Sequence, residues 1–143
     1  MAEFQSGVAL VDTWAQSRAQ RAQKTGTAVV YVVYADGRIA GFYSLSAHSV
    51  QREDINGGWL KRNAPEQIPT ILLGMLGVDT AYQGLGLGKS LLRDAIMRAM
   101  AASKQIGARA LLVDPVDEKV AKFCKRYGFR ELAGTTRLAL PLA

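Results

Sequence analysis

The apolar sequence Ile71-Leu72-Leu73-Gly74-Met75-Leu76-Gly77-Val78 runs into Asp79-Thr80-Ala81-Tyr82 and then into Gln83-Gly84-Leu85-Gly86-Leu87-Gly88-Lys89-Ser90. The apolar run predicts a buried strand, and the pattern of residues 91–100 predicts an amphipathic helix. A glycine loop between a strand and a helix lets the backbone approach a ligand closely. The first helical turn adds free N–H groups and the positive end of the dipole. The stretch therefore predicts a site for an anion such as a pyrophosphate.

Two known phosphate loops fail to match this stretch. A Walker loop ending in Gly88-Lys89-Ser90 would need glycine at position 83, where the chain has Gln83. A dinucleotide fingerprint starting at Gly84 would need glycine at position 89. The pattern Q/R-x-x-G-x-G/A does match, at Gln83, Gly86 and Gly88. A glycine-rich turn without a ligand remains the alternative.

Composition indicates one globular domain with a basic surface. The chain has 143 residues, 49% of them hydrophobic, and a net charge of +6. The charge fits an anionic partner such as CoA or RNA, or only a solvated basic surface. We expect no membrane segment and no secretory leader. The single cysteine, Cys124, excludes an internal disulfide and suits a reducing cytoplasm.

The order of predicted elements is typical of an α/β fold with a mixed sheet. A strand, phosphate loop, helix and strand in succession imply parallel neighbours with a ligand at their carboxyl ends. We expect a helix over 6–25 capped near Ser6, strands over 27–34 and 38–48 joined by an Asp36-Gly37 turn, an irregular segment over 51–67, a strand opened by Pro69, a helix over 87–105, a strand over 108–113, a helix over 116–127, and a last strand or hairpin over 129–140.

Helical spacing also predicts which side chains face the core. The expected inner residues are Leu10, Trp14, Ala15, Ala19 and Ala22 in the first helix, Leu91, Leu92, Ala95, Ile96, Ala99 and Met100 in the second, and Val120, Ala121, Phe123, Cys124 and Tyr127 in the third. His48 is the only histidine, and at a strand end we interpret it as solvent-facing rather than catalytic. The sequence contains no cluster of Cys and His residues, so we expect no metal site.

Three segments in order resemble the GNAT superfamily of N-acetyltransferases. Residues 76–79 resemble the strand that pairs with the pantetheine arm, residues 83–88 the acyl-CoA pyrophosphate loop, and residues 123–129 the F-Y-x-x-x-G-F ending. The resemblance implies one GNAT domain over residues 1–143, a central mixed sheet flanked by helices, and acetyl-CoA as donor. The implied acyl-CoA contacts are Leu76, Gly77, Val78, Gln83, Gly84, Leu85, Gly86, Leu87, Gly88, Lys89, Ser90 and Phe123.

A narrower resemblance covers nearly the whole chain. Phe4-x-Ser6-Gly7 before Leu10-Val11-Asp12-x-Trp14, Gly41 to Leu45, and Arg62-Asn63-x-Pro65-x-x-Ile68-Pro69 resemble GNAT toxins of bacterial toxin–antitoxin pairs. Those toxins acetylate the α-amino group of aminoacyl-tRNA and block translation. The resemblance implies a ribbon-helix-helix antitoxin and a homodimer. It also implies that the family's first strand is missing before Phe4.

Two positions are candidates for catalysis. A backbone N–H near Leu76 is the expected donor to the thioester oxyanion. The family's tyrosine, which protonates the departing thiolate, falls at Cys124 in this chain. Cys124 is a small core residue, a substitute acid with an ordinary pKa of about 8.5, or a change that quenches activity. Tyr127, one turn on, is an alternative acid.

Basic residues supply the expected RNA contacts. These are Arg18, Arg21, Lys24, Lys61, Arg62 and Arg93, which would bind phosphates without reading sequence. Two other functions stay open. One is acetylation of a small-molecule or protein amine. The other is a catalytically impaired protein that binds acyl-CoA and an antitoxin.

Overall fold

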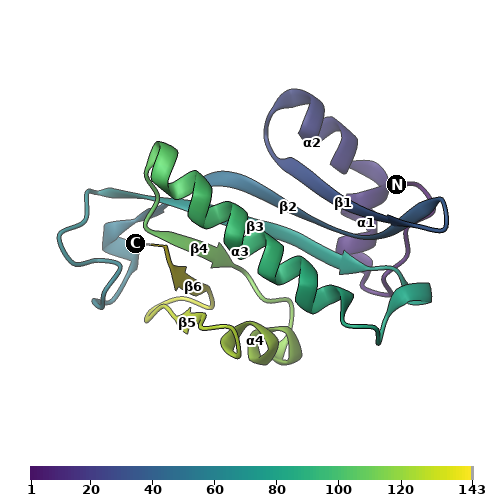
Figure 1. Ribbon diagram of the computed structural model, residues 1–143. Coiled ribbons are helices and arrows are strands. Elements are labelled where there is room, and N and C mark those ends of the chain that lie inside the picture. Colours follow the sequence, from purple (N-terminus) through teal and green to yellow (C-terminus); the bar gives the residue numbers. More distant parts are fainter. Residues whose placement is uncertain (143) are drawn as a thin grey trace. The chain divides into compact units, whose positions relative to one another are not determined.

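A computed structural model describes residues 1–142 and confirms an α/β fold built on a mixed sheet. The strand order is β1-β2-β3-β4-β6-β5 (Figure 1). Strands β3 and β4 are parallel, and the pairs β1–β2, β4–β6 and β5–β6 are antiparallel. The elements are α1 Ala9–Ser17, α2 Ala19–Thr25, β1 Val29–Ala35, β2 Arg38–Gln51, β3 Gln67–Val78, α3 Leu87–Ile106, β4 Ala110–Val113, α4 Glu118–Lys125, β5 Arg130–Glu131 and β6 Leu138–Pro141. Within residues 1–142, no helix is long and apolar enough to cross a membrane.

The chain divides into two compact units, which are described separately. The first unit contains Met1–Ser46 and Gly74–Met97. Its β1–β2 hairpin turns at Asp36 and Gly37, whose φ angles are 54° and 73°. Positive φ at both central residues is the signature of a type I′ turn, which matches the twist of the flanking strands. The predicted hairpin is confirmed.

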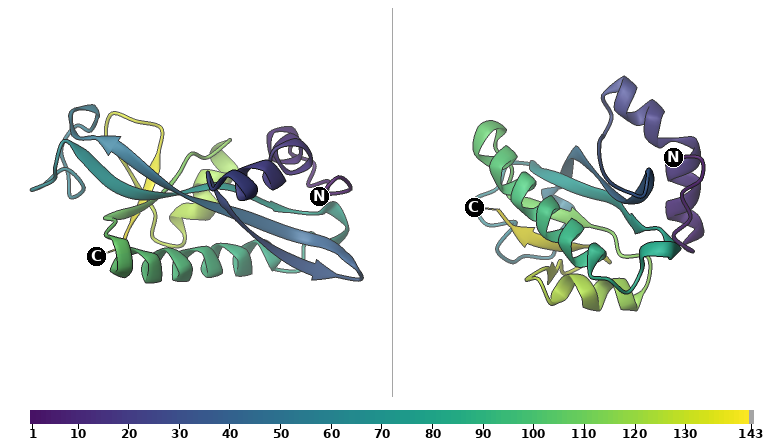
Figure 2. Two further views of the ribbon diagram at one scale, coloured as in Figure 1. Left: turned by 90° about the horizontal axis from the view of Figure 1, so that it is seen from above. Right: turned by 45° about the vertical axis from the view of Figure 1, so that its right-hand side comes forward.

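The single helix predicted over 6–25 is wrong, because the chain bends at Arg18. Its φ and ψ are −127° and −22°, so it separates α1 from α2. Figure 2 shows α1 and α2 as two helices. Ser6 is not a helix cap either. Its N–H and its hydroxyl both donate to Asp12 Oδ1 at 2.7 Å, so a carboxylate of the first turn holds the segment that precedes the helix.

Aromatic packing builds the core of the first unit. Phe42 is fully buried, and the Trp14 ring stacks on it at 6.0 Å while Phe4 meets it edge-on at 5.1 Å. Val11 and Ala15 of α1 complete this cluster. Leu10 is 58% exposed, so its predicted core position is wrong.

The second unit contains Ala47–Leu73 and Arg98–Ala143. Its centre is the parallel pairing of β3 and β4, from Ile71 with Leu111 to Leu73 with Val113. The segment predicted to be polar and irregular contributes Ile55 and Leu60 to the core. Loop residues therefore bury apolar side chains against one face of these strands.

Helical periodicity predicted part of the buried face correctly. In α3, Leu91, Leu92, Ala95 and Ala99 are buried, but Met100 is 43% exposed. In α4, Ala121 and Cys124 are buried, while the other predicted residues are partly exposed.

Two strands are longer than predicted. Strand β2 continues to Gln51, and β3 begins at Gln67, before Pro69.

We predict that Gly77→Ala destabilises the fold by about 1–3 kcal/mol, because overpacking strains a close-packed core. A Cβ at Gly77 would lie 2.7 Å from Val11 Cγ1 and 3.2 Å from the Phe4 ring. Urea unfolding measures the change. Gly88→Ala is the matched control, since its Cβ would meet nothing nearer than Val78 Cγ2 at 3.7 Å. Equal stability of the two variants would contradict this packing.

Candidate active site

A buried carboxylate fixes the junction between β3 and the glycine loop. Asp79 is 1% exposed, and its Oδ2 accepts a hydrogen bond from the Gln5 N–H at 3.1 Å. Oδ1 accepts from the Ala81 N–H at 3.0 Å and lies 3.3 Å from Arg38 Nη2. The Asp79 N–H donates to the Ala40 carbonyl at 2.8 Å. One residue therefore joins the N-terminal segment, the start of β2 and the start of the loop.

The Asp79 carboxyl is ionised because its hydrogen bonds outweigh its burial. Burial alone would raise its pKa. The N–H donors of Ala81 and Gln5, together with the charge of Arg38, hold the pKa below the ordinary value for aspartate. The network therefore depends on a charge that is retained at neutral pH.

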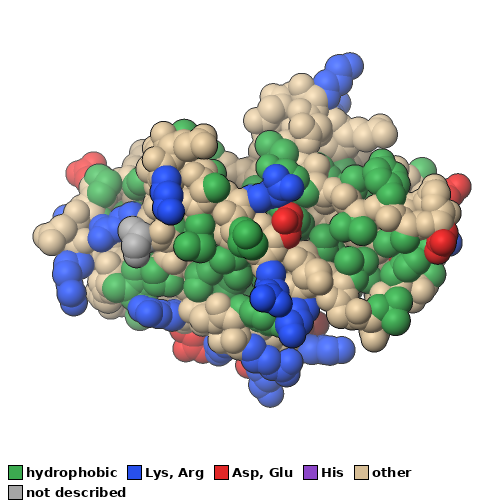
Figure 3. All heavy atoms as spheres, viewed as in Figure 1, with side chains coloured by type: hydrophobic (Ala, Val, Ile, Leu, Met, Phe, Trp, Pro, Cys, Tyr) green, Lys and Arg blue, Asp and Glu red, His purple; other side chains and the backbone are tan. Residues whose placement is uncertain are grey.

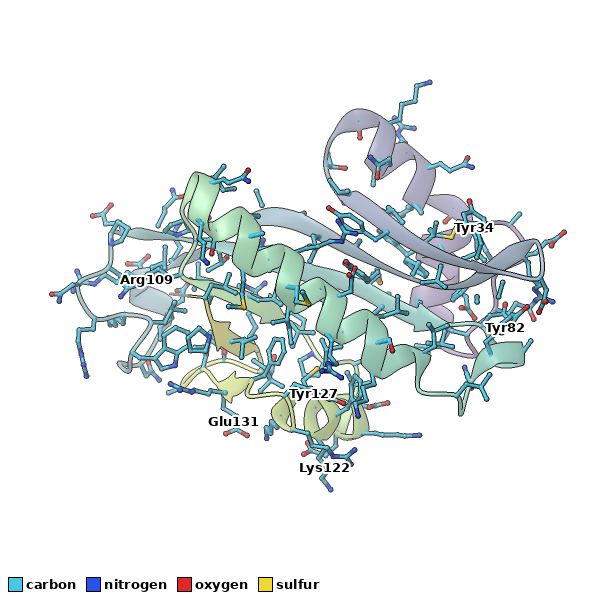
Figure 4. The ribbon with its side chains drawn as sticks, in the orientation of Figure 1. Tyr34, Tyr82, Arg109, Lys122, Tyr127 and Glu131 are labelled. Carbon is cyan, nitrogen blue, oxygen red and sulfur yellow. The ribbon has the colours of Figure 1, made fainter. Side chains whose placement is uncertain are left out.

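Tyr82 holds the loop to the hairpin turn. Its hydroxyl donates to the Ala35 carbonyl at 3.1 Å and lies 2.9 Å from Asp36 Oδ2. Figure 4 shows the position of Tyr82. The hydrogen bond to Asp36 raises the pKa of the phenol, so the hydroxyl keeps its proton. The Arg38 guanidinium lies 6.0 Å from the Tyr82 ring.

Gln83, an expected acyl-CoA contact, uses its side chain inside the protein. Its Nε2 donates to the Ser6 carbonyl at 2.7 Å and to the Val78 carbonyl at 2.9 Å. The side chain therefore positions the loop against the N-terminal segment.

The glycine loop leaves open space beside its backbone. Gly84 and Gly86 have φ angles of 81° and 82°, and a Cβ on either would meet no atom within 4 Å. Leu85 between them is 77% exposed, and the helix α3 begins at Leu87. Accessible N–H groups in a glycine turn and at a helix start form a concave surface that can bind an anion.

The end of β3 also offers backbone groups at one edge. The Met75 N–H donates to the Ser44 hydroxyl at 3.0 Å, and the Asp79 N–H also faces β2. Because successive residues of a strand direct their backbone groups to opposite edges, Leu76 and Val78 face away from β2. The pairing of β3 with β4 ends at Leu73 with Val113. This arrangement suits the predicted N–H donor at Leu76.

Cys124 lies on the buried face of α4 in the second unit. It is 2% exposed, and burial raises the pKa of its thiol to about 11. The expected ordinary thiol pKa is therefore wrong, because the low-dielectric surroundings disfavour the thiolate. Phe123 and Tyr127 are partly exposed, and their rings meet edge-on at 5.4 Å.

The predicted RNA contacts differ in their surroundings. Arg18, Arg21 and Lys24 are exposed along α1 and α2, and Arg93 is exposed on α3. In the second unit Arg62 is exposed, whereas Lys61 is partly buried and its Nζ donates to the Ile55 carbonyl at 3.0 Å. Lys61 therefore has a structural partner.

Two arrangements of side chains were not predicted from the sequence. Lys and Arg side chains gather over α4 (Figure 3), where Lys119, Lys122 and Arg126 are exposed. Their spacing of three and four residues places them on one helical face, a signal that the sequence did contain. The second group joins His48 to Arg137 across 89 residues, which no local pattern reveals. Within residues 1–142, no group of three or more His, Cys, Asp or Glu could hold a metal.

Comparison with known proteins gives consistent matches. The family described as acetyltransferase (GNAT) domain matches residues 26–131. The chain is 40% identical over 139 residues to the tRNA-acetylating toxin of Mycobacterium tuberculosis, covering 97% of this chain and 82% of that protein.

Two solved structures agree with the fold. AtaT complexed with acetyl-methionyl-tRNAfMet has a TM-score of 0.85 and 25% identity, covering 96% of this chain and 85% of that one. A tyrosine-to-phenylalanine mutant of AtaT, bound to the C-terminus of the antitoxin AtaR and acetyl-CoA, has a TM-score of 0.81 and 25% identity, covering 98% and 83%.

We predict that Asp79→Asn lowers the free energy of unfolding at neutral pH by about 1–3 kcal/mol, since an amide cannot replace every hydrogen bond of the carboxylate. The folded-state pKa lies below the unfolded value, so the carboxylate's contribution is present above about pH 4 and is lost as pH falls. Urea unfolding at several pH values measures this. A stability difference that stays constant down to pH 2 would contradict the assignment.

Proposed function

The chain belongs to the acetyltransferase (GNAT) family, and on that premise we propose that it transfers the acetyl group of acetyl-CoA to the α-amino group of aminoacyl-tRNA and so blocks translation. The observation that carries this proposal is the open glycine loop at the start of α3, held by Asp79, Tyr82 and Gln83. The similarity to a tRNA-acetylating toxin over almost the whole chain supports the acceptor.

In this proposal the loop backbone binds the pyrophosphate of acetyl-CoA. Gly84 and Gly86 leave room for the phosphates, and the first turn of α3 at Leu87, Gly88 and Lys89 donates its N–H groups. The Lys89 side chain is exposed and adds positive charge. Gln83 acts as a positioning residue, since its amide is bonded to two carbonyls of the chain.

The edge of β3 supplies the electrostatic part of the reaction. The neutral amine attacks the thioester carbonyl, the C–N bond forms, the C–S bond breaks to release a thiolate, and the nitrogen loses one proton to solvent. The Leu76 N–H would stabilise the negative charge that develops on the carbonyl oxygen. The residues around Asp79 act indirectly, because they fix the end of β3 and thereby the direction of this N–H.

The departing thiolate needs a proton. Burial raises the pKa of Cys124 to about 11, so its thiol is a poorer acid than an ordinary cysteine. Tyr127 offers a partly exposed hydroxyl one turn away. General acid catalysis contributes on the order of 10²–10⁴ in rate, so its loss slows the transfer without removing binding and orientation.

The remaining partners follow from the same proposal. Exposed Arg18, Arg21, Lys24, Arg62 and Arg93 would bind tRNA phosphates, and the basic face of α4 adds candidates that include Lys122. A cognate antitoxin would neutralise the toxin, as AtaR binds AtaT. We further propose a ribbon-helix-helix antitoxin, a homodimer and action in the bacterial cytoplasm.

A second function is favoured by the burial of Cys124. With only a buried, weakly acidic thiol at this position, the chain would bind acyl-CoA and the antitoxin but turn over poorly.

We predict that the protein transfers radiolabelled acetyl groups from acetyl-CoA to total charged tRNA. Uncharged tRNA should remain unlabelled because it lacks the α-amino group. Free amino acids should remain unlabelled because they lack the RNA that the protein binds. Label that follows free amines instead would favour a small-molecule acetyltransferase. Acetyl-CoA binding without transfer would favour the impaired protein.

We predict that Cys124→Tyr increases kcat for charged tRNA by about tenfold or more, since a phenol at this position restores the missing acid. Cys124→Ala is the control and should leave the rate close to that of the parent. Equal rates for Cys124→Tyr and the parent would remove position 124 from the mechanism.

A further inference from the structure

Two consecutive residues of β3, Gly74 and Met75, face the same side of the sheet. A Cβ on Gly74 would lie 3.0 Å from the Ser44 hydroxyl oxygen. Met75 packs against the cluster around Phe42, which lies two residues before Ser44 in β2 and therefore on the same face. Because successive residues of a regular strand alternate between faces, this pair forms a β-bulge.

The backbone hydrogen bonds of β3 change direction across this bulge. In the second unit, the Pro69 carbonyl accepts from the N–H of Arg109, the residue before β4, so odd-numbered residues there face β4 and even-numbered residues face β2. In the first unit, the odd-numbered residues face β2. The Met75 N–H donates to Ser44, and the Asp79 N–H donates to the Ala40 carbonyl. The extra residue of the bulge accounts for this reversal.

The reversal decides where the Leu76 N–H points. In a regular strand the even-numbered residues would continue to face β2, and the Leu76 N–H would be used in that pairing. With the bulge, Leu76 and Val78 face away from β2, beyond the last β3–β4 pair at Leu73 with Val113. The N–H proposed to stabilise the thioester oxyanion is therefore available only because β3 is bulged.

The Ser44 side chain holds the bulge. Its Oγ accepts the Met75 N–H at 3.0 Å, in the place where a regular ladder uses a backbone carbonyl. Ser44 is 3% exposed, so this hydrogen bond lies inside the protein. Without the hydroxyl, the Met75 N–H would lose its partner there. Donors inside a protein are rarely left unsatisfied, so the strand would have to change its conformation.

We propose that Ser44 is a positioning residue for acetyl transfer, because its hydroxyl maintains the bulge that directs the Leu76 N–H at the thioester carbonyl. This inference rests on the proposed function and assigns a side chain to a step that otherwise uses backbone groups. The hydrogen bond between Ser44 and Met75 does not involve the glycine loop. Ser44 therefore acts on the chemical step and not on the binding of the pyrophosphate.

An NMR titration with acetyl-CoA tests this assignment without requiring turnover. In the parent, acetyl-CoA should shift the amide signals of residues 84–90 and of Leu76. In Ser44→Ala, the signals of residues 84–90 should still shift with the same Kd, which shows that the variant is folded, and the Leu76 shift should be lost.

Transfer kinetics give a second readout for Ser44→Ala. Removing one oxyanion donor lowers kcat by about 10²–10³. Misdirecting the Leu76 N–H should therefore lower kcat for charged tRNA by about tenfold or more, while the KM for acetyl-CoA stays unchanged.

Two further variants separate this role from a general loss of structure. Gly74→Ala should act like Ser44→Ala, since its Cβ would displace the Ser44 hydroxyl. Ser46→Ala is the matched control, because Ser46 lies on the same face of β2 and its hydroxyl bonds to no other described residue. It should keep both the Leu76 shift and kcat.

The outcomes distinguish this inference from the proposed function. An unchanged Leu76 shift and kcat in Ser44→Ala, or an equal loss in Ser46→Ala, overturns the inference alone. Loss of the Leu76 shift in Ser44→Ala, with no acetyl transfer to tRNA by the parent, counts against the proposed acceptor alone. No binding of acetyl-CoA by the parent overturns both.

Discussion

The buried, ionised carboxylate of Asp79 is the interaction on which the candidate site depends. It accepts hydrogen bonds from the N-terminal segment and from the loop itself, and it pairs with Arg38 at the hairpin. A buried charge is stable only when several donors satisfy it. The segments that supply these donors are therefore held next to one another. Tyr82 and Gln83 add further ties from neighbouring positions. The glycine loop, which has little packing of its own, therefore starts from a rigid base.

The fold and the loop were predictable because their signals are local. Residues 71–90 contain a strand pattern, three alternating glycines and a helix start, and the structure places them in that order. The Asp36-Gly37 turn was equally predictable, since few residues tolerate positive φ at both positions. The break at Arg18 was not, because the helical pattern of the sequence continues across it.

The partners of the site residues could not be read from the sequence. Gln83 matched a ligand-binding pattern, yet its amide is bonded to Ser6 and Val78. Cys124 was open to interpretation as an acid until its burial was known, and that burial raises its pKa to about 11. Hydrogen bonds over long separations, such as those of Asp79 and Arg137, depend on the folded backbone. A sequence thus indicates which chemistry a segment offers, and the fold decides which groups remain available for it.

The central claim is that the loop and the end of β3 together bind acetyl-CoA, and an NMR titration tests it most directly. The account predicts that acetyl-CoA shifts the backbone amide signals of residues 84–90 and of Leu76 and Val78. Desulfo-CoA should shift the loop signals equally and the Leu76 signal less, because it keeps the pyrophosphate but lacks the thioester. Saturable binding of acetyl-CoA that leaves residues 84–90 unshifted, or no binding at millimolar ligand, would contradict the account.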